Sequence, residues 1–216
     1  MTFGKSNGSW PLRLPALFLI WSFLPGPVPM SLAQTSPQSE RTAGSTGWNV
    51  EQLIESLAKN RQAEVRFEET AFSNLLTQPL KTHGILRFTP PAGLEKHITV
   101  PYDERYLVED DTVLFESKTK GTKRTLSLHD YPALRAFIEA FRSTLANDVI
   151  TLRRFYSMTL QGEPRQWVLI LRPLDKAVQE LVESIRFSGE REHVSSIEVL
   201  APDGDRSVMA ITTGAQ

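Results

Sequence analysis

The sequence has 216 residues, with 24 basic and 25 acidic side chains, a formal net charge of −1 and no cysteine. The near-neutral charge and the lack of a basic run argue against a nucleic-acid-binding protein. The absence of cysteine excludes disulfides and thiol-based catalysis, and a chain of this length can bury one sizeable core.

The first 33 residues have the pattern of a secretory signal peptide. Lys5 and Arg13 are their only charges, and an apolar run of about 11 residues follows from Leu14 to Leu24. The alternative is a permanent membrane anchor, but a membrane-spanning helix needs about 20 apolar residues. Small residues at positions 31 and 33 predict cleavage between Ala33 and Gln34, so we expect an exported protein that does not span the membrane after cleavage.

Residues 34–47 lack large apolar side chains, which predicts a flexible linker before a single domain at 48–216. The domain begins with helix signals, because Asn49 and Gln52 have the spacing of a capping box. Trp48 and Leu53 are spaced for a hydrophobic staple. A helix is therefore expected, and its apolar face would consist of Val50, Leu53, Ile54, Leu57 and Ala58.

Two groups of segments alternate with a period of two and are separated by turn residues, which is typical of antiparallel meanders. The first group comprises Glu64–Phe72, Gly84–Phe88, His97–Val100, Arg105–Val108 and Val113–Glu116. The second comprises Phe155–Leu160, Gln166–Leu171, Val182–Phe187, Ser195–Leu200 and Ser207–Thr213.

A second helix is expected between these groups, from about Asp130 to Leu145. Its apolar stripe consists of Leu134, Phe137, Ile138, Phe141 and Leu145. Residues Lys176–Ser184 fit either a helix or the start of a strand.

These elements predict one α+β domain, in which a large curved antiparallel sheet of eight to eleven strands carries two helices over one face. The helices could pack tightly as core, or they could act as a lid over an apolar cleft. The sequence pattern leaves both arrangements open.

The sequence offers no constellation that indicates catalysis, a metal or a cofactor. Its four histidines do not share a metal-ligand spacing, and there is no nucleophile elbow and no glycine-rich phosphate loop after a strand. Glu68 and Glu69 are adjacent on a predicted strand, so they point to opposite faces and cannot converge on one substrate atom. We expect no catalytic residue, no metal ligand and no cofactor, and hence not an enzyme.

Several short motifs follow one another from Val65 onward. They are Val65–Glu69, Gly84–Phe88 followed by Pro91, Pro101, the hairpin Tyr106–Leu114, Trp167–Pro173 and the closing hairpin from Asp203 to Ile211. These motifs, and their order, resemble those of the periplasmic outer-membrane lipoprotein carriers of the LolA type. Lys96 and His97 stand where the family tends to have a basic residue and then an aromatic one, and Asp111 replaces the hairpin glycine. The sequence is therefore similar to a divergent LolA-like member.

The resemblance implies an unclosed β-barrel with helices as a lid over an apolar cavity. It also implies a soluble periplasmic carrier that binds the acyl chains of a lipoprotein or another envelope lipid and moves it toward the outer membrane. An inner-membrane donor complex and an outer-membrane acceptor are the expected partners. The candidate lipid-binding residues are Phe67, Leu86, Phe88, Phe115, Phe137, Ile138, Phe141, Trp167 and Leu169.

Two other functions stay open at this point. A non-catalytic adaptor of an envelope lipid biosynthesis or export complex would have the same fold with a filled core and would bind no lipid. An envelope hydrolase or transferase would need a convergent polar site, which the sequence does not show.

Overall fold

The computed structural model describes residues 47–59 and 64–212. The predicted signal peptide and all of the predicted linker except Gly47 lie outside these residues. The described part is an α+β domain with one antiparallel sheet of eleven strands. The strands are β1 (Glu64–Phe72), β2 (Leu80–Thr89), β3 (Gly93–Val100), β4 (Glu104–Glu109), β5 (Thr112–Ser117), β6 (Thr122–Ser127), β7 (Tyr156–Glu163), β8 (Gln166–Pro173), β9 (Ser184–Glu190), β10 (His193–Leu200) and β11 (Arg206–Thr212).

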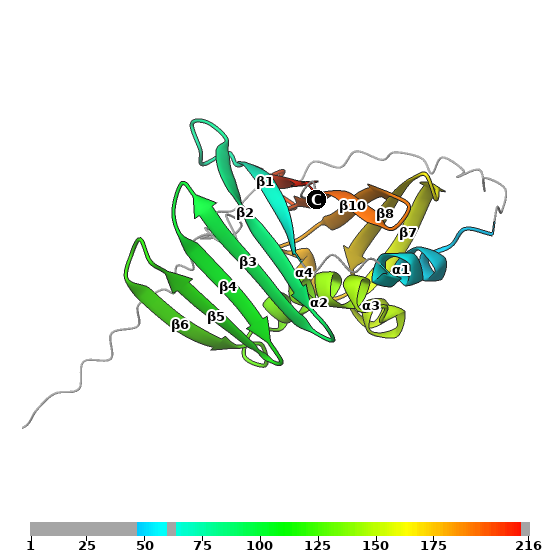
Figure 1. Cartoon of the computed structure of the whole chain (residues 1–216), viewed down its shortest axis with the longest axis horizontal. Coiled ribbons are helices and arrows are strands. Elements are labelled where there is room, and N and C mark those ends of the chain that lie inside the picture. The colour runs from blue at the N-terminus through cyan, green and yellow to red at the C-terminus, as the bar shows by residue number, and fades with distance from the viewer. Residues whose placement is uncertain (1–46, 60–63, 213–216) are drawn as a thin grey trace, which may run out of the picture.

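The strand order is β6-β5-β4-β3-β2-β1-β11-β10-β9-β8-β7. Each half of the sheet is a meander in which consecutive strands pair, and the pairing of β1 with β11 joins the two halves. Figure 1 shows the β2–β6 half and the β7–β10 half on either side of the helices. Because β6 and β7 end the strand order without pairing with each other, the sheet is unclosed, as the family resemblance implied.

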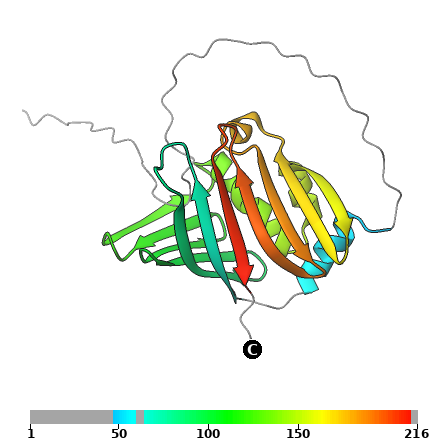
Figure 2. The ribbon, with the colours of Figure 1, turned by 90° about the horizontal axis from the view of Figure 1, so that it is seen from above.

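Four helices lie on one side of the sheet in the described residues, where the sequence predicted two (Figure 2). They are α1 (Val50–Lys59), α2 (Pro132–Leu145), α3 (Val149–Phe155) and α4 (Lys176–Gln179). The capping box of α1 is confirmed, because Asn49 Oδ1 accepts from the Gln52 backbone N–H at 2.9 Å and Gln52 Oε1 accepts from the Asn49 backbone N–H at 3.2 Å. Helix α2 begins two residues later than predicted, with Pro132 in its first turn, where the missing N–H costs nothing.

The sequence did not predict β6 or α3, and it left the segment that contains α4 ambiguous. Strand β6 is an edge strand that carries only one buried apolar side chain, Leu126, so its alternation was too weak to recognise. Helix α3 is short, and its N-cap, Asp148, accepts from the Thr151 N–H at 2.9 Å. Helix α4 takes up the first part of the ambiguous segment, so β9 starts at Ser184 rather than at Val182.

The register of the strands fixes which side chains share a face, because directly opposed residues of neighbouring strands point to the same side. Phe67 opposes Ile211 on β11 and Gly84 on β2, and Gly84 opposes Ile98 on β3. Phe67 and Ile98 are buried in one apolar cluster with Leu53 and Leu57 of α1. This face, which we call the inner face, is therefore the one that the helices cover.

Two apolar clusters fill the space between the inner face and the helices. The large apolar cluster contains buried residues of α1, α2 and α3 and of strands from both halves of the sheet. The small apolar cluster consists of Val108, Val113, Leu126, Leu128, Leu134 and Ile138. Helix α2 contributes side chains to both clusters, so it lies between them.

Gly84 is the one position on the inner face of β2 where a side chain is sterically forbidden. A Cβ atom there would lie 2.0 Å from the carbonyl oxygen of His97, at a register shift between β2 and β3. The substitution G84A must therefore displace backbone. We expect it to lower the free energy of unfolding by about 1–3 kcal/mol, measured by urea denaturation.

The matched control is G47A, because a Cβ at Gly47 would meet nothing within 4 Å. It should change stability by less than about 0.5 kcal/mol. Equal stabilities of G84A and G47A would contradict the packing described for β2.

Candidate functional site

All six strand residues that the sequence proposed for a lipid site point to the inner face. Leu86 and Phe88 share the face of Gly84, and the register carries that face across β3 and β4 to Phe115 on β5. In the other half of the sheet, Leu169 opposes Phe187, which opposes Ile197, and this row continues through Met209 to Glu69 on β1. Trp167 lies two residues from Leu169 and shares its face.

The side chains of these strand residues differ in how much of their surface is exposed to solvent. Trp167 and Leu169 are fully buried, and Phe67 and Phe115 are 3% exposed, whereas Leu86 and Phe88 are only partly buried. Trp167 is fixed in place, because its indole Nε1 donates to the Arg191 carbonyl at 2.9 Å and Gly189 leaves room for the ring. Trp167 is thus a core residue in this arrangement, and Leu86 and Phe88 are the more accessible members of the group.

The helix residues proposed from sequence divide between the two clusters. Phe137 and Phe141 are partly buried and pack against the large apolar cluster, with ring centroids 5.0 Å apart. Phe141 also makes an edge contact with Phe187 of β9 at 5.5 Å. Ile138 packs instead in the small apolar cluster, so it does not join the two phenylalanines.

Sequence analysis missed a polar group on the inner face. The Glu69 carboxylate accepts from Lys96 Nζ at 2.5 Å, from Ser207 Oγ at 2.5 Å and from Thr82 Oγ1 at 3.4 Å. The Glu69 and Lys96 side chains are only 17% and 16% exposed, and Lys96 Nζ lies 5.3 Å from the centroid of the Phe67 ring. The signal for Glu69 was in the sequence, because the period-two pattern puts it on the face of Val65 and Phe67.

A second inner-face carboxylate lies nearby on β4. Glu104 is 1% exposed and accepts from Tyr106 Oη at 3.1 Å, Lys120 Nζ at 3.1 Å and Ser117 Oγ at 3.4 Å. Burial and the negative charges of Glu104 and Glu69 raise the pKa of Tyr102 and that of Tyr106.

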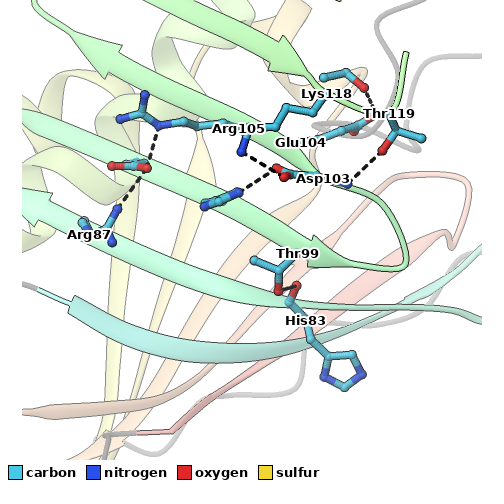
Figure 3. A network of polar contacts seen from close by, with 11 residues as sticks. His83, Arg87, Thr99, Asp103, Glu104, Arg105, Lys118 and Thr119 are labelled. Carbon is cyan, nitrogen blue, oxygen red and sulfur yellow. Dashed lines mark hydrogen bonds and ion pairs between the residues drawn. The ribbon is translucent and has the colours of Figure 1, made fainter. Parts of the chain in front are cut away.

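The outer face of the same strands carries a separate ion-pair network, shown in Figure 3. The Glu95 carboxylate accepts from Arg87 Nη1 at 3.1 Å and from Arg105 Nε at 2.7 Å, and hydrogen bonds from Arg105 hold its pKa below the ordinary value despite burial. Asp103 pairs with His97 at 2.8 Å and Lys118 at 3.1 Å. These contacts cross from strand to strand, so the network stabilises the sheet.

The two neighbouring glutamates of β1 separate as the sequence predicted. Glu68 lies on the outer face near Lys81 and His83, whereas Glu69 lies inside. Within residues 47–59 and 64–212, no three His, Cys, Asp or Glu side chains are arranged to hold a metal ion. None of the helices in this described part is long and apolar enough to cross a membrane.

Comparison with known proteins assigns the chain to a protein family. The family described as outer membrane lipoprotein carrier protein LolA-like matches residues 42–216. The chain belongs to this LolA-like family. A search of curated proteins found no match.

Solved structures give distant similarities to the LolA-like chain. The LolA superfamily protein NE2245 from Nitrosomonas europaea matches with 10% identity and a TM-score of 0.39, covering 76% of this chain and 91% of that one. A putative outer membrane lipoprotein-sorting protein domain from Vibrio parahaemolyticus matches with 7% identity and a TM-score of 0.41, over 76% and 89% of the two chains. The Pseudomonas aeruginosa MucA/MucB complex matches with 12% identity and a TM-score of 0.40, over 77% and 57%.

The Glu69–Lys96 pair makes the stability of the LolA-like domain depend on pH. Burial acts to raise the pKa of the Glu69 carboxyl, but the charge and hydrogen bond of Lys96, together with Ser207 and Thr82, outweigh it and lower the pKa from its ordinary 4.5. The folded protein thus binds this proton less readily than the unfolded chain. The stabilisation is complete above about pH 4.5 and is lost as the pH falls through the folded pKa.

We therefore expect the double variant E69Q/K96M to lose less stability than the wild type between pH 5 and pH 3. Urea denaturation at each pH measures the two slopes, and the other carboxylates contribute equally to both proteins. Parallel slopes would show that Glu69 does not contribute to the acid sensitivity.

Proposed function

We propose that this LolA-like protein is an exported periplasmic carrier. It would bind the acyl chains of a lipoprotein or another envelope lipid between α2 and the inner face and move them toward the outer membrane. Its first 33 residues would serve as the signal peptide, cleaved near Ala33/Gln34. A donor complex in the inner membrane and an acceptor at the outer membrane would be its partners, and the carrier itself would catalyse no reaction.

The observation that carries this proposal is the contact between α2 and β9. Phe137 and Phe141 are only partly buried, and they meet the sheet through the edge contact of Phe141 with Phe187. Separation of α2 from this contact would expose an apolar surface made of the large cluster. The α2 helix is therefore the candidate lid, and Phe137 and Phe141 are its candidate cargo-contacting residues.

The energetics favour a movable lid over a permanently open surface. Each buried methylene contributes about 0.8 kcal/mol, so an acyl chain of about 14 carbons needs roughly 11 kcal/mol of apolar contact to leave a membrane. Side chains that pack against each other in the empty carrier can make those contacts with the chain instead. Contacts with the acyl chain would then compensate for the free energy of exposing these apolar side chains when the lid opens.

A non-catalytic adaptor is the second candidate, and a specific observation favours it. Phe67, Phe115, Trp167 and Leu169 are at most 3% exposed, which is the packing of a filled core. An adaptor with this core would dock on an envelope complex through its surface and would bind no acyl chain.

Native mass spectrometry of residues 34–216 purified from the periplasm separates the two functions. The carrier should retain a co-purifying mass that disappears on extraction with organic solvent, and fragmentation of that mass would identify the lipid. A bare protein mass, together with no thermal shift on addition of acyl-chain detergents, would reject the carrier and support the adaptor.

Charged substitutions test the site itself. We expect F141D and F88D each to lower the amount of captured lipid at least about tenfold, because a carboxylate in an apolar contact costs more than 1.4 kcal/mol. The control is L75D, since Leu75 is 71% exposed on the loop after β1. Folding of each variant is checked by circular dichroism, and unchanged lipid capture by folded F141D and F88D would rule out this site.

A further inference from the structure

The two edges of the sheet differ in how they are protected against pairing with another chain. At one edge, β6 carries Lys123 and Arg124, which are both exposed, and charged side chains discourage a further strand. At the other edge, β7 has no charged residue and no proline from Tyr156 to Gly162. Among residues 64–212, β8 is the only strand that pairs with β7, which ends the row of strands in Figure 2. Strand β7 is therefore an edge without the usual protection.

The hydrogen bonds between β7 and β8 leave a defined set of backbone groups free on β7. The Leu174 N–H donates to the Phe155 carbonyl at 2.9 Å, and these two residues continue the register of the two strands. Hydrogen-bonded pairs alternate along an antiparallel ladder, so every second residue of β7, counted from Phe155, bonds to β8. Met158 and Leu160 lie between those residues and direct their N–H and C=O groups away from β8. Within residues 47–59 and 64–212, these groups have no hydrogen-bond partner.

A second copy of β7, running antiparallel to the first, can pair with all of these groups. When Met158 of each copy opposes Leu160 of the other, every free N–H meets a free C=O. A shift of the register by two positions would engage Tyr156, whose N–H already donates within the last turn of α3, or Gly162, whose φ of 87° departs from an extended strand. The two strands thus have one favoured register, with a two-fold axis at Thr159.

The side chains that meet in this register are compatible. On the outer face, Thr159 opposes Thr159 of the second copy, and Ser157 opposes Gln161 of the second copy; all of them are exposed and uncharged. On the inner face, Met158 and Leu160 are partly buried and pack against the large apolar cluster. Threonine pairs and apolar pairs stabilise an antiparallel ladder, and no pair brings like charges together. Pairing would also cover apolar surface of Met158 and Leu160 that is exposed in the single chain.

We propose that β7 is the interface of a two-fold symmetric dimer, in which β7 of one copy pairs antiparallel with β7 of a second copy about Thr159. The two eleven-stranded sheets then form one continuous sheet. The axis is perpendicular to the sheet at this point, so the helices of both copies lie on the same side and the inner faces adjoin at Met158 and Leu160. This inference is independent of the carrier function, since it rests only on the backbone and side chains of β7.

Single cysteines in residues 34–216 test the register, because the native chain contains no cysteine. Opposed residues of a non-hydrogen-bonded antiparallel pair have Cα atoms about 4.5 Å apart, a distance that a disulfide can bridge. Thr159 forms such a pair across the axis, so mild oxidation of T159C should give mainly a disulfide-linked dimer. S157C alone should stay monomeric, since the two Ser157 residues would lie about 13 Å apart along the strands. A mixture of S157C and Q161C should crosslink.

The matched control is T125C, because Thr125 is an exposed threonine on the other edge strand, β6. Its dimer yield should be no more than random collision gives. A yield from T159C that is no higher than the yield from T125C, or from S157C alone, would overturn the proposed ladder.

Sedimentation velocity over a range of protein concentrations measures the dimer without a crosslink. The variant T159K should raise the dimer Kd at least about tenfold, because two lysines would face each other at the axis. T125K is its control and should leave the Kd unchanged. Circular dichroism checks that each variant is folded. A wild type that stays monomeric at every concentration, or a folded T159K that dimerises as the wild type does, would reject the dimer.

Hydrogen exchange at the amides of Met158 and Leu160 identifies what covers β7. In the dimer, these amides should exchange more slowly as the protein concentration rises. Slow exchange in a monomer would show that another segment of the same chain covers the edge, and fast exchange at every concentration would show an edge that stays free. Either of these two results contradicts the proposal.

Discussion

The pairing of β1 with β11 is the constraint on which the rest of the domain depends. It joins residues from the two ends of the domain, Arg66–Phe72 and Arg206–Thr212, in an antiparallel ladder of seven residue pairs. Each half of the sheet can form from local hairpins, but the halves share one curved surface only through this ladder. Loop closure over such a distance costs entropy that hairpins avoid, so the ladder needs support from side-chain contacts. The hydrogen bond from Ser207 on β11 to Glu69 on β1 provides one such contact inside the fold.

The pairing of β1 with β11 makes one continuous curved sheet, and α2 packs against its inner face. The helix has one set of side chains in each apolar cluster, with Leu134 and Ile138 in the small cluster and Phe137, Ala140 and Phe141 at the large one. A sheet of eleven strands with free edges at β6 and β7 can change its curvature more easily than a closed barrel, because no ladder locks the two edges together. The proposed carrier function would use this freedom to pass from the filled core described here to an opened surface. The edge strand β6 is polar along most of its length, which protects it from pairing with another chain.

The polar side chains of the two faces contribute in different ways. On the outer face, Glu95 pairs with Arg87 and Arg105, whose side chains are partly exposed to solvent. Ion pairs that are exposed to solvent add little stability individually. On the inner face, Glu69 and Glu104 are mostly or fully covered, so each needs its cationic and hydroxyl partners to offset the loss of water. A buried ion pair is rarely more stable than an apolar pair of the same size.

Much of this structure was predictable from local patterns in the sequence. The capping box of Asn49 and Gln52, the Phe-rich α2 and ten of the eleven strands follow from spacing alone, because the periods of helix and strand depend only on neighbouring residues. The separation of Glu68 from Glu69 follows from the same alternation. Strand β6 and the short helices α3 and α4 were missed or left ambiguous, since their signals are too brief or too polar to stand out.

The location of the candidate site was a different problem. Alternation predicted that Phe67 and Glu69 share a face, but it could not tell which face the helices cover, nor that Lys96 reaches Glu69 and that Ile138 packs apart from Phe137. Those outcomes depend on the register of strands distant in sequence, and Ser207 and Glu69 are 138 positions apart. The sequence by itself thus determined the elements and the composition of each face of each strand. Only the tertiary structure decided which faces meet, because that choice is made by long-range pairing and packing that no local pattern encodes.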